Sequence, residues 1–327
     1  MSKSKKPYQP FWVNGTETGE SQRECATRYE AIKQVASKYH RRFSVLDIGC
    51  NYAYFDFRLL EDFDCVPVVV DTKPLRDLID RNEAKLIWLA KRVTAQELYK
   101  LSQCESFDIV LALSVIHHFD DWQLAVDSLL NLGKDVIIEL PGDEPHAVGY
   151  ENQKAIRDYV LKKDHELLLE SESHVDPGVI RKMVLLKGRD DIHHQTMDWQ
   201  ERDTPQVDVL VLSDYQKKTI TIEHKRTYEE RPFIHGMNLW NFKLLNGQYP
   251  AGLTSKVKSA LNEMDRFHDD LRPWNFIIDG EKLHPIDFDD KTWRKEPELQ
   301  GFEKCCKLLN MDVDYKNEKF TELFRTA

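Results

Sequence analysis

The chain is poor in three features that mark whole classes of protein: glycine, cysteine and long apolar runs. Its 327 residues include 13 glycines, and no apolar run approaches the ~18 residues that a membrane-spanning helix needs. The N-terminal sequence MSKSKKPYQPFWV also lacks the apolar core of a signal peptide. We therefore expect no transmembrane segment and a cytoplasmic location.

The few cysteines exclude two further classes. Six are present, and they form no C-x-x-C pair and no spacing typical of a disulfide framework. We expect them to be reduced and mostly buried, Cys50 included. Neither a cysteine metal site nor a disulfide-stapled fold is therefore indicated.

The chain also has fewer positively than negatively charged residues. Lys and Arg number 46 against 56 Asp and Glu, which gives a formal net charge of -10. Because phosphate contacts need clustered Lys and Arg, general nucleic-acid binding is disfavoured. The hydrophobic content of 41% and the length favour a globular chain of about two domains.

The most informative pattern spans residues 43–74, FSVLDIGCNYAYFDFRLLEDFDCVPVVVDTKP. It predicts a strand ending in Asp47, a sharp turn at Gly49, a helix over 54–60 and a second strand ending in Asp71. Strand, turn, helix and acid in this order are typical of a nucleotide-type cofactor pocket.

The side chains of this turn indicate which cofactor it holds. Asn51 and Tyr54 stand where a dinucleotide site needs its second and third glycines, which disfavours a pyrophosphate. The carboxylate of Asp47 favours a cation, and Asp71 is placed to accept from ribose hydroxyls. S-adenosylmethionine, with its ammonium, ribose and adenine, satisfies both acids.

The wider pattern from 25 to 140 alternates helices and strands, which predicts an α/β fold with a parallel sheet. We expect a helix over 28–38 and strands over 45–48, 66–70, 85–89, 109–113 and 136–140. Ligands of such sheets lie beyond the carboxyl ends of the strands. The residues selected by that rule are Asp47, Gly49, Asp71, Arg92 or Val93, Ser114 and Glu139.

Four ordered motifs resemble those of class I methyltransferases: LDIGCNYAYF, VVVDTKP, FDIVLALSVIHHF and DVIIELPG. HELLLESESHV and GVIRKMVLLKG resemble the antiparallel hairpin that closes the sheet in this family. The resemblance implies a Rossmann-like seven-stranded sheet over 25–188 that binds S-adenosylmethionine. Asn51 and Ala53 depart from the family, which often has glycine at these positions. The cofactor-binding residues we predict are Arg28, Asp47, Gly49, Asn51, Asp71, Arg92, Val93 and Ser114.

The segment before the first strand has two interpretations. Residues 24–29 form a lid over the cofactor, with Arg28 or Tyr29 meeting its carboxylate, or they belong to a plain first helix that covers the sheet. We predict a tail or lid over 1–24, the methyltransferase domain over 25–188 and a second domain over 189–327.

Candidate catalytic groups follow the fourth strand. Methyl transfer to a hydroxyl or amine requires removal of a proton, and His117 or His118 is the predicted base. With an acceptor that is already anionic, such as a phosphate, the same histidines would donate hydrogen bonds instead. A third interpretation has them cap a helix or pack on adenosine. The loop after the fifth strand adds Asp143, Glu144 and His146 on the expected acceptor side.

A second pattern with specific chemistry is FHDDLRPWNFIIDGEKLHPIDFDD. It resembles the H-x-D-L-x-x-x-N loop, short hairpin and D-F-[GD] of kinase-like enzymes, in the acidic form of aminoglycoside and choline phosphotransferases. The resemblance implies Asp270 as the base and Asn275 and Asp287 as ligands of Mg bridging ATP phosphates. No glycine occurs over 189–235, so the Gly-rich loop is missing and the α+β kinase-like part looks truncated.

The order of the two parts resembles the bifunctional kinase/methyltransferases that terminate bacterial O-antigen chains. Three functions remain open. The first is a methyltransferase acting on a hydroxyl or phosphate of a small molecule or glycan terminus, with the kinase-like half accessory. The second is an enzyme that phosphorylates and then methylates its acceptor, and the third is a non-catalytic cofactor-binding scaffold.

Overall fold

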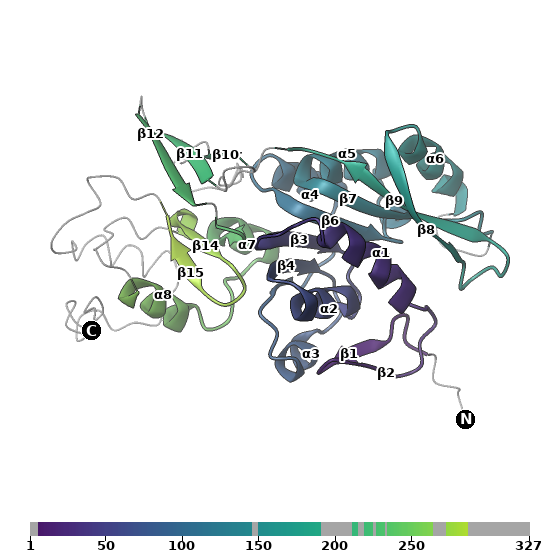
Figure 1. Cartoon of the computed structure of the whole chain (residues 1–327), viewed down its shortest axis with the longest axis horizontal. Coiled ribbons are helices and arrows are strands. Elements are labelled where there is room, and N and C mark those ends of the chain that lie inside the picture. Colours follow the sequence, from purple (N-terminus) through teal and green to yellow (C-terminus); the bar gives the residue numbers. More distant parts are fainter. Residues whose placement is uncertain are drawn as a thin grey trace.

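The computed structural model describes residues 6–145, 150–190, 211–214, 219–224, 227–232, 234–263 and 273–286. Its centre is a seven-stranded sheet with helices on both faces (Figure 1). The strands are β3 (Phe43–Ile48), β4 (Cys65–Val70), β5 (Ile87–Leu89), β6 (Phe107–Leu113), β7 (Gly133–Leu140), β8 (His165–Glu172) and β9 (Ile180–Lys187).

The strand order is β5-β4-β3-β6-β7-β9-β8. The first five strands in this order are parallel to one another, whereas β9 runs antiparallel to both β7 and β8. The predicted α/β class, the seven strands and the closing antiparallel hairpin are therefore confirmed.

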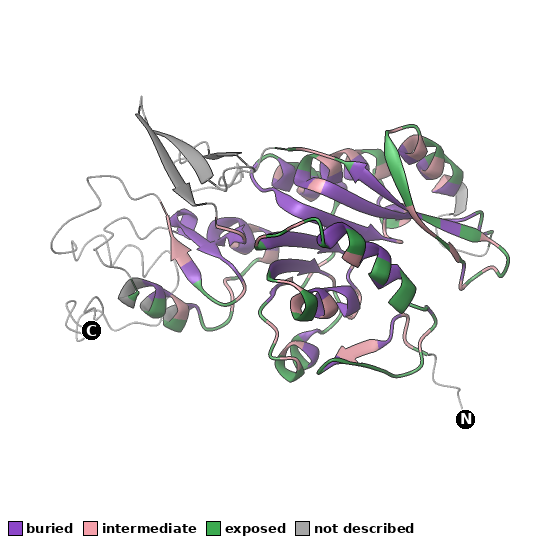
Figure 2. Cartoon of the chain, in the orientation of Figure 1, coloured by how far each residue is buried: buried purple, intermediate pink, exposed green. Residues whose placement is uncertain are grey.

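Helices cover the sheet as the alternating pattern predicts. They are α1 (Ala26–Ala36), α2 (Tyr54–Asp62), α3 (Arg76–Arg81), α4 (Ala95–Ser102), α5 (Trp122–Leu132) and α6 (Tyr150–Leu161). Residues of α1 and α2 pack on one face with Val45, while α4 and α5 pack on the other with Leu46. Because the central strands are covered on both faces, every residue of β3, β4 and β6 is buried (Figure 2).

The predicted element boundaries are close to the observed ones, and the differences have local causes. The first helix begins at Ala26 rather than Arg28, because the Glu24 carboxylate accepts from the Thr27 N–H at 2.9 Å and completes the first turn. The third strand of the prediction is shorter than expected, Ile87–Leu89, since β5 lies at the edge and pairs only with β4.

Two smaller sheets and two helices follow in the C-terminal half, and an N-terminal hairpin precedes the main sheet. The predicted hairpin between Asn275 and Asp287 is confirmed as the antiparallel pair β14–β15. The elements are β1 (Phe11–Val13), β2 (Thr16–Thr18), β10 (Val211–Asp214), β11 (Thr219–His224), β12 (Thr227–Pro232), β13 (Met237–Asn238), α7 (Leu239–Asn246), α8 (Leu253–Asn262), β14 (Phe276–Ile278) and β15 (Leu283–Pro285).

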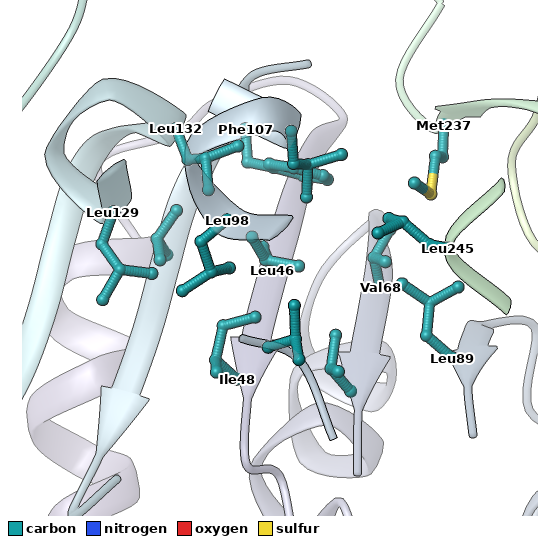
Figure 3. Close-up of a cluster of buried hydrophobic side chains, with 14 of the residues drawn as sticks. Leu46, Ile48, Val68, Leu89, Leu98, Phe107, Leu129, Leu132, Met237 and Leu245 are labelled. Atoms are coloured by element: carbon teal, nitrogen blue, oxygen red, sulfur yellow. The ribbon is translucent and has the colours of Figure 1, made fainter. Parts of the chain in front are cut away.

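Helix α7 shares one hydrophobic core with the main sheet. Leu245 lies beside Val68 of β4 and Leu89 of β5 (Figure 3), and all three belong to one cluster of buried side chains. The buried Glu105 carboxylate accepts from the Asn241 side chain at 2.7 Å and from the Asn238 N–H at 2.9 Å. The predicted domain boundary at 188/189 therefore runs through a continuous core, although the boundary itself stays a prediction.

If α7 is an integral part of this core, Leu245→Ala should lower the free energy of unfolding by about 2–5 kcal/mol, as truncation of a buried leucine usually does. Leu167 is 50% exposed on β8, so Leu167→Ala is the matched control and should cost less than about 0.5 kcal/mol. Urea denaturation followed by tryptophan fluorescence measures both. Equal losses for the two variants would contradict the shared core.

Candidate active site

A cavity of about 290 Å³ opens at the carboxyl ends of β3, β4 and β6. The position is the one that open parallel sheets use for ligands. Four predicted cofactor residues line it: Gly49, Asp71, Arg92 and Val93. His118, predicted as a catalytic residue, lines the same cavity. These predicted residues therefore line one cavity, and their assignment to a cofactor site and their roles remain predictions.

The turn after β3 has left-handed backbone conformations at three residues, one of which is a glycine. Gly49, Asn51 and Ala53 all have positive φ, of 75°, 57° and 54°. Such left-handed conformations cost a residue with a side chain roughly 1–2 kcal/mol. Gly49 has a further constraint, since a Cβ there would lie 2.8 Å from Val115 Cγ2. The loop geometry is thus kept at the cost of local strain.

Asp71 is held in place by this loop. Its Oδ2 accepts from the Asn51 N–H at 2.8 Å, and its Oδ1 accepts from the Lys73 N–H at 2.9 Å. Each carboxylate oxygen has a second lone pair for a ligand. The carboxylate at the end of β4 is therefore fixed in orientation and still able to accept from two hydroxyl groups.

Next to Asp71 lie buried polar atoms that lack protein partners within the part of the chain that the structure describes. Asp47 Oδ2 and Asn51 Oδ1 have no donor, and Arg28 Nε has no acceptor. The Arg28 guanidinium acts electrostatically on Asp47, so the two charges belong to one neighbourhood. Buried polar groups are normally satisfied. Free acceptors beside a free donor suit a ligand that carries both an ammonium and a carboxylate.

Glu139, at the end of β7, holds the other half of the site together. The buried carboxylate accepts from Arg28 Nη2 at 2.6 Å, from Arg23 Nη2 and from the Ser114 hydroxyl. Burial by itself would raise the pKa of Glu139, but Arg28 and Arg23 outweigh it and lower the pKa to about 2. Glu139 is therefore a permanent anion between two permanent cations.

A second buried ion pair adjoins the first. Arg181 of β9 donates from Nε and Nη2 to the two oxygens of Glu144, both at 2.5 Å, and from Nη1 to the Ser114 hydroxyl at 2.9 Å. The N-terminal segment closes the cluster, because Arg23 Nη1 donates to the Tyr8 hydroxyl at 3.0 Å. Three arginines face two glutamates here, so the cluster carries a positive excess.

The two predicted catalytic histidines have different surroundings: His118 lines the cavity, and His117 is within electrostatic reach of Arg181. Their rings lie side by side, with centroids 4.2 Å apart and planes tilted by 48°. His118 stands at the cavity, and its carbonyl accepts from Arg92 Nη2 at 2.6 Å. His117 has a buried Nδ1 without a partner among the described residues, and desolvation, reinforced by His118 and Arg181, lowers its pKa to about 4. His117 is therefore neutral at physiological pH, as a base or a neutral donor must be.

Of the two residues proposed for the lid, only Arg28 reaches this cluster. The Tyr29 hydroxyl donates to Asp62 at 2.6 Å, and the ring of Tyr29 lies under the Arg58 guanidinium, 3.7 Å from its centroid. Tyr29 is thus part of the packing between α1 and α2. The interpretation as a plain first helix holds, since α1 covers the sheet, and Arg28 of this helix pairs with Glu139. The lid over the cofactor stays a prediction.

The sequence pattern missed several residues of this cluster: Tyr8, Arg23, Arg181 and His174, whose ring meets that of Tyr8 edge-on with centroids 5.1 Å apart. For Arg181 the sequence held a signal, because Arg181, Met183 and Leu185 stand at every second position and therefore share the buried face of β9. A charged residue in a buried register is usually paired or functional. Tyr8 and Arg23 had no such signal, because they lie in an irregular segment.

The kinase-like residues are described only in part. Asn275 is buried, and its carbonyl accepts from the Ile286 N–H at 2.8 Å. Asp270, Asp287 and the loop residue His146 lie outside the described residues. The predicted metal ligands Asn275 and Asp287 and the predicted base Asp270 therefore stay predictions.

The strand order, with β9 antiparallel to both β7 and β8, is the one that the resemblance to class I methyltransferases implies. No protein-family model matches the chain. In sequence it is similar to the O-antigen chain terminator bifunctional methyltransferase/kinase WbdD of Escherichia coli, with 21% identity over 359 aligned residues, 86% of this chain and 50% of that protein. A second Escherichia coli protein of the same description has the same identity and coverage. The chain thus spans about half the length of these curated relatives, and the resemblance predicted from the motifs is confirmed.

Solved structures also match the chain, at low similarity. A crystal structure of WbdD with the kinase inhibitor LY294002 matches with a TM-score of 0.45 and 19% identity, over 93% of this chain and 88% of that one. The N-terminal domain of EvdMO1 with SAH bound matches with a TM-score of 0.40 and 11% identity, over 56% of this chain and 92% of that one.

Replacing the central anion should cost far more stability than replacing a surface acid. Glu139→Gln leaves Arg23 and Arg28 without a counter-charge in a buried place, and we expect a loss of about 3–5 kcal/mol in the free energy of unfolding. Glu170 pairs with Lys182 at 3.5 Å on the surface, so Glu170→Gln should cost at most about 1 kcal/mol. Chemical denaturation of both variants measures the difference, and similar losses would show that Glu139 does not hold the cluster.

Proposed function

We propose that the protein is an S-adenosylmethionine-dependent methyltransferase that acts on a small molecule or a glycan terminus. The observation that carries the proposal is the cavity at the switch between β3, β4 and β6, which the fixed carboxylate of Asp71 lines. Asn51, whose N–H donates to Asp71, and Asp47 each have an acceptor without a donor among the described residues, and Arg28, which acts electrostatically on Asp47, has an N–H without an acceptor there. That combination matches a ligand with a ribose at one end and a zwitterion at the other.

In this proposal each half of the cofactor has its own residues. Asp71 accepts from the ribose hydroxyls, and Val93 and Val115 border the space for the adenine. Asp47 and Asn51 accept from the ammonium, and Arg28 donates to the carboxylate. The bound cofactor supplies an electrophilic methyl group on a sulfonium, and the protein's task is to align an acceptor with it.

The acceptor would lie on the side of Ser114, His117 and Arg181. The positive excess of this cluster favours an acceptor that carries negative charge, such as a phosphate, which needs no base. For a hydroxyl acceptor, neutral His117 is placed to take the proton. The description of the curated relatives as O-antigen chain terminators supports a glycan terminus.

The location and partners are also part of the proposal. No described helix has both the length and the apolar character needed to cross a bilayer. We propose a cytoplasmic enzyme with a small-molecule or glycan acceptor and no general affinity for nucleic acid, on the basis of the net charge of -10.

Loss of the ribose-binding carboxylate should weaken cofactor binding. Asp71→Ala removes acceptors for two hydroxyl groups, and we expect the affinity for S-adenosylhomocysteine to fall about tenfold to hundredfold, the usual range for hydrogen bonds to a charged group. Isothermal titration calorimetry measures it. Asp77→Ala, an exposed acid on α3, is the control and should bind as the unmodified protein does. Unchanged affinity in Asp71→Ala would contradict the proposed cofactor site.

A second candidate function is a two-step enzyme that phosphorylates and then methylates its acceptor. It is supported by the β14–β15 hairpin directly after Asn275, where the kinase-like pattern requires one, and by the description of the curated relatives. ATP and Mg would be its additional cofactors, with Asp270 as base and Asn275 and Asp287 as metal ligands.

The two candidates differ in one measurement. If the kinase-like half is active, ATP with Mg should bind in calorimetry, and Asp287→Ala should abolish that binding while affinity for S-adenosylhomocysteine stays unchanged. If the half is accessory, ATP with Mg gives no binding heat. Heat that persists in Asp287→Ala would contradict the predicted metal site.

A further inference from the structure

We propose that Asp56 is a second acid of the methyl-donor site, and that Asp47 and Asp56 share one proton until the ammonium of the cofactor displaces it to solvent. This inference rests on the proposed function and deepens it. No motif pointed to Asp56, which lies in the first turn of α2, beneath the turn that follows β3.

Two buried acids here lack hydrogen-bond donors. Asp47 is 1% exposed and Asp56 is fully buried. Both oxygens of Asp56 and Oδ2 of Asp47 have no partner among the described protein groups, and Asp56 acts electrostatically on Asp47. Ionising both groups would bury two like charges without donors, so burial favours the retention of one proton by the pair.

The surrounding charges favour this shared proton. Asp71 at the end of β4 acts on Asp47 as a further acid, and Arg28 of α1 acts on it as an opposing cation. Arg28 is already paired with Glu139. The thiols of Cys50 and Cys65 are the other titratable neighbours, and burial raises the pKa of both, so they stay uncharged.

Burial is the main cause of the raised pKa values of the pair. It raises the pKa of Asp47 well above its ordinary value, with Asp56 and Asp71 adding to the effect, and it raises the pKa of Asp56 to about 7. The two groups titrate as a unit. Near neutral pH the free protein therefore retains a proton that exposed aspartates would have lost.

Two observations point from the pair to a ligand rather than to a purely structural contact. Asp47 and Asn51, whose Oδ2 and Oδ1 have no donor among the described residues, flank Gly49 in the chain, and Gly49 lines the cavity. Arg28 Nε is a buried donor without a partner among the same residues, and the Arg28 guanidinium acts electrostatically on Asp47. A ligand with adjacent ammonium and carboxylate groups would satisfy both kinds of atom. A structural pair would keep its proton whether or not such a ligand is bound.

The consequence is a proton balance for binding. The protonated pair plus an ammonium gives two carboxylates, the bound ammonium and one proton in solvent. Affinity for the cofactor should then rise with pH over the range in which the free pair still holds its proton, by at most about tenfold per pH unit for one proton. The range ends near the titration of the ligand's own α-amino group, at about pH 7.7.

The test is calorimetric titration of the full chain with S-adenosylhomocysteine between about pH 5.5 and about pH 7, where the ligand's amine is charged. Each pH is measured in two buffers with different heats of protonation, which gives the number of protons released. We expect net release and a several-fold gain in affinity per pH unit. 5′-Methylthioadenosine, which has the adenosine and thioether without the amino-acid end, should bind with no release and no pH dependence.

Two variants test whether the released proton comes from Asp47 and Asp56. In Asp56→Asn an amide hydrogen replaces the shared proton, so release on binding should drop to near zero and affinity should become flat with pH. Glu61→Gln removes an exposed acid from the same helix and should release as many protons as the unmodified protein.

The outcomes separate this inference from the function on which it rests. S-adenosylhomocysteine that binds without proton release, or an Asp56→Asn protein that releases as many protons as the unmodified one, overturns the shared proton and leaves the methyltransferase proposal intact. If neither S-adenosylhomocysteine nor 5′-methylthioadenosine binds, the proposed function fails as well. The measurement on the unmodified protein is decisive by itself if the Asp56→Asn variant does not fold.

Discussion

The buried ion pairs of Glu139 are the interactions on which the rest of the site depends. One buried carboxylate at the end of β7 receives Arg23 from the N-terminal segment, Arg28 from α1 and Ser114 from the end of β6. The N-terminal region that holds Arg23 and Arg28 therefore meets the ends of β6 and β7 at a single point. A buried charge that lost its partners would be costly, so each segment is held in one position relative to the sheet.

This anchor also links the two halves of the site. Arg28 uses Nη2 for Glu139, while its Nε has no partner among the described residues. Ser114 accepts from Arg23 and Arg181 and donates to Glu139. In the proposed function one network would therefore position both the cofactor-binding residues around Asp47 and Asp71 and the acceptor-binding residues around His117 and Arg181, so that aligning donor with acceptor would need little further ordering.

The sequence predicted the parts of this arrangement that depend on local order. Strand alternation and the acids at strand ends located Asp47, Gly49 and Asp71, because the carboxyl ends of parallel strands always meet. Long-range pairing was not predictable in the same way. Arg23 and Glu139 lie 116 residues apart, and nothing local in the N-terminal segment marks Arg23 as buried. The packing of α7 on β4 and β5 was missed for the same reason, and the predicted boundary at 188/189 divides that core.

A crystal structure of the protein with S-adenosylhomocysteine tests the cofactor site most directly. We expect the ribose hydroxyls on Asp71, the adenine beside Val93, the ammonium at Asp47 and Asp56, and the carboxylate at Arg28. A ligand that binds outside the cavity at the ends of β3, β4 and β6, or one whose ribose does not contact Asp71, would contradict the assignment of this site to a methyl donor.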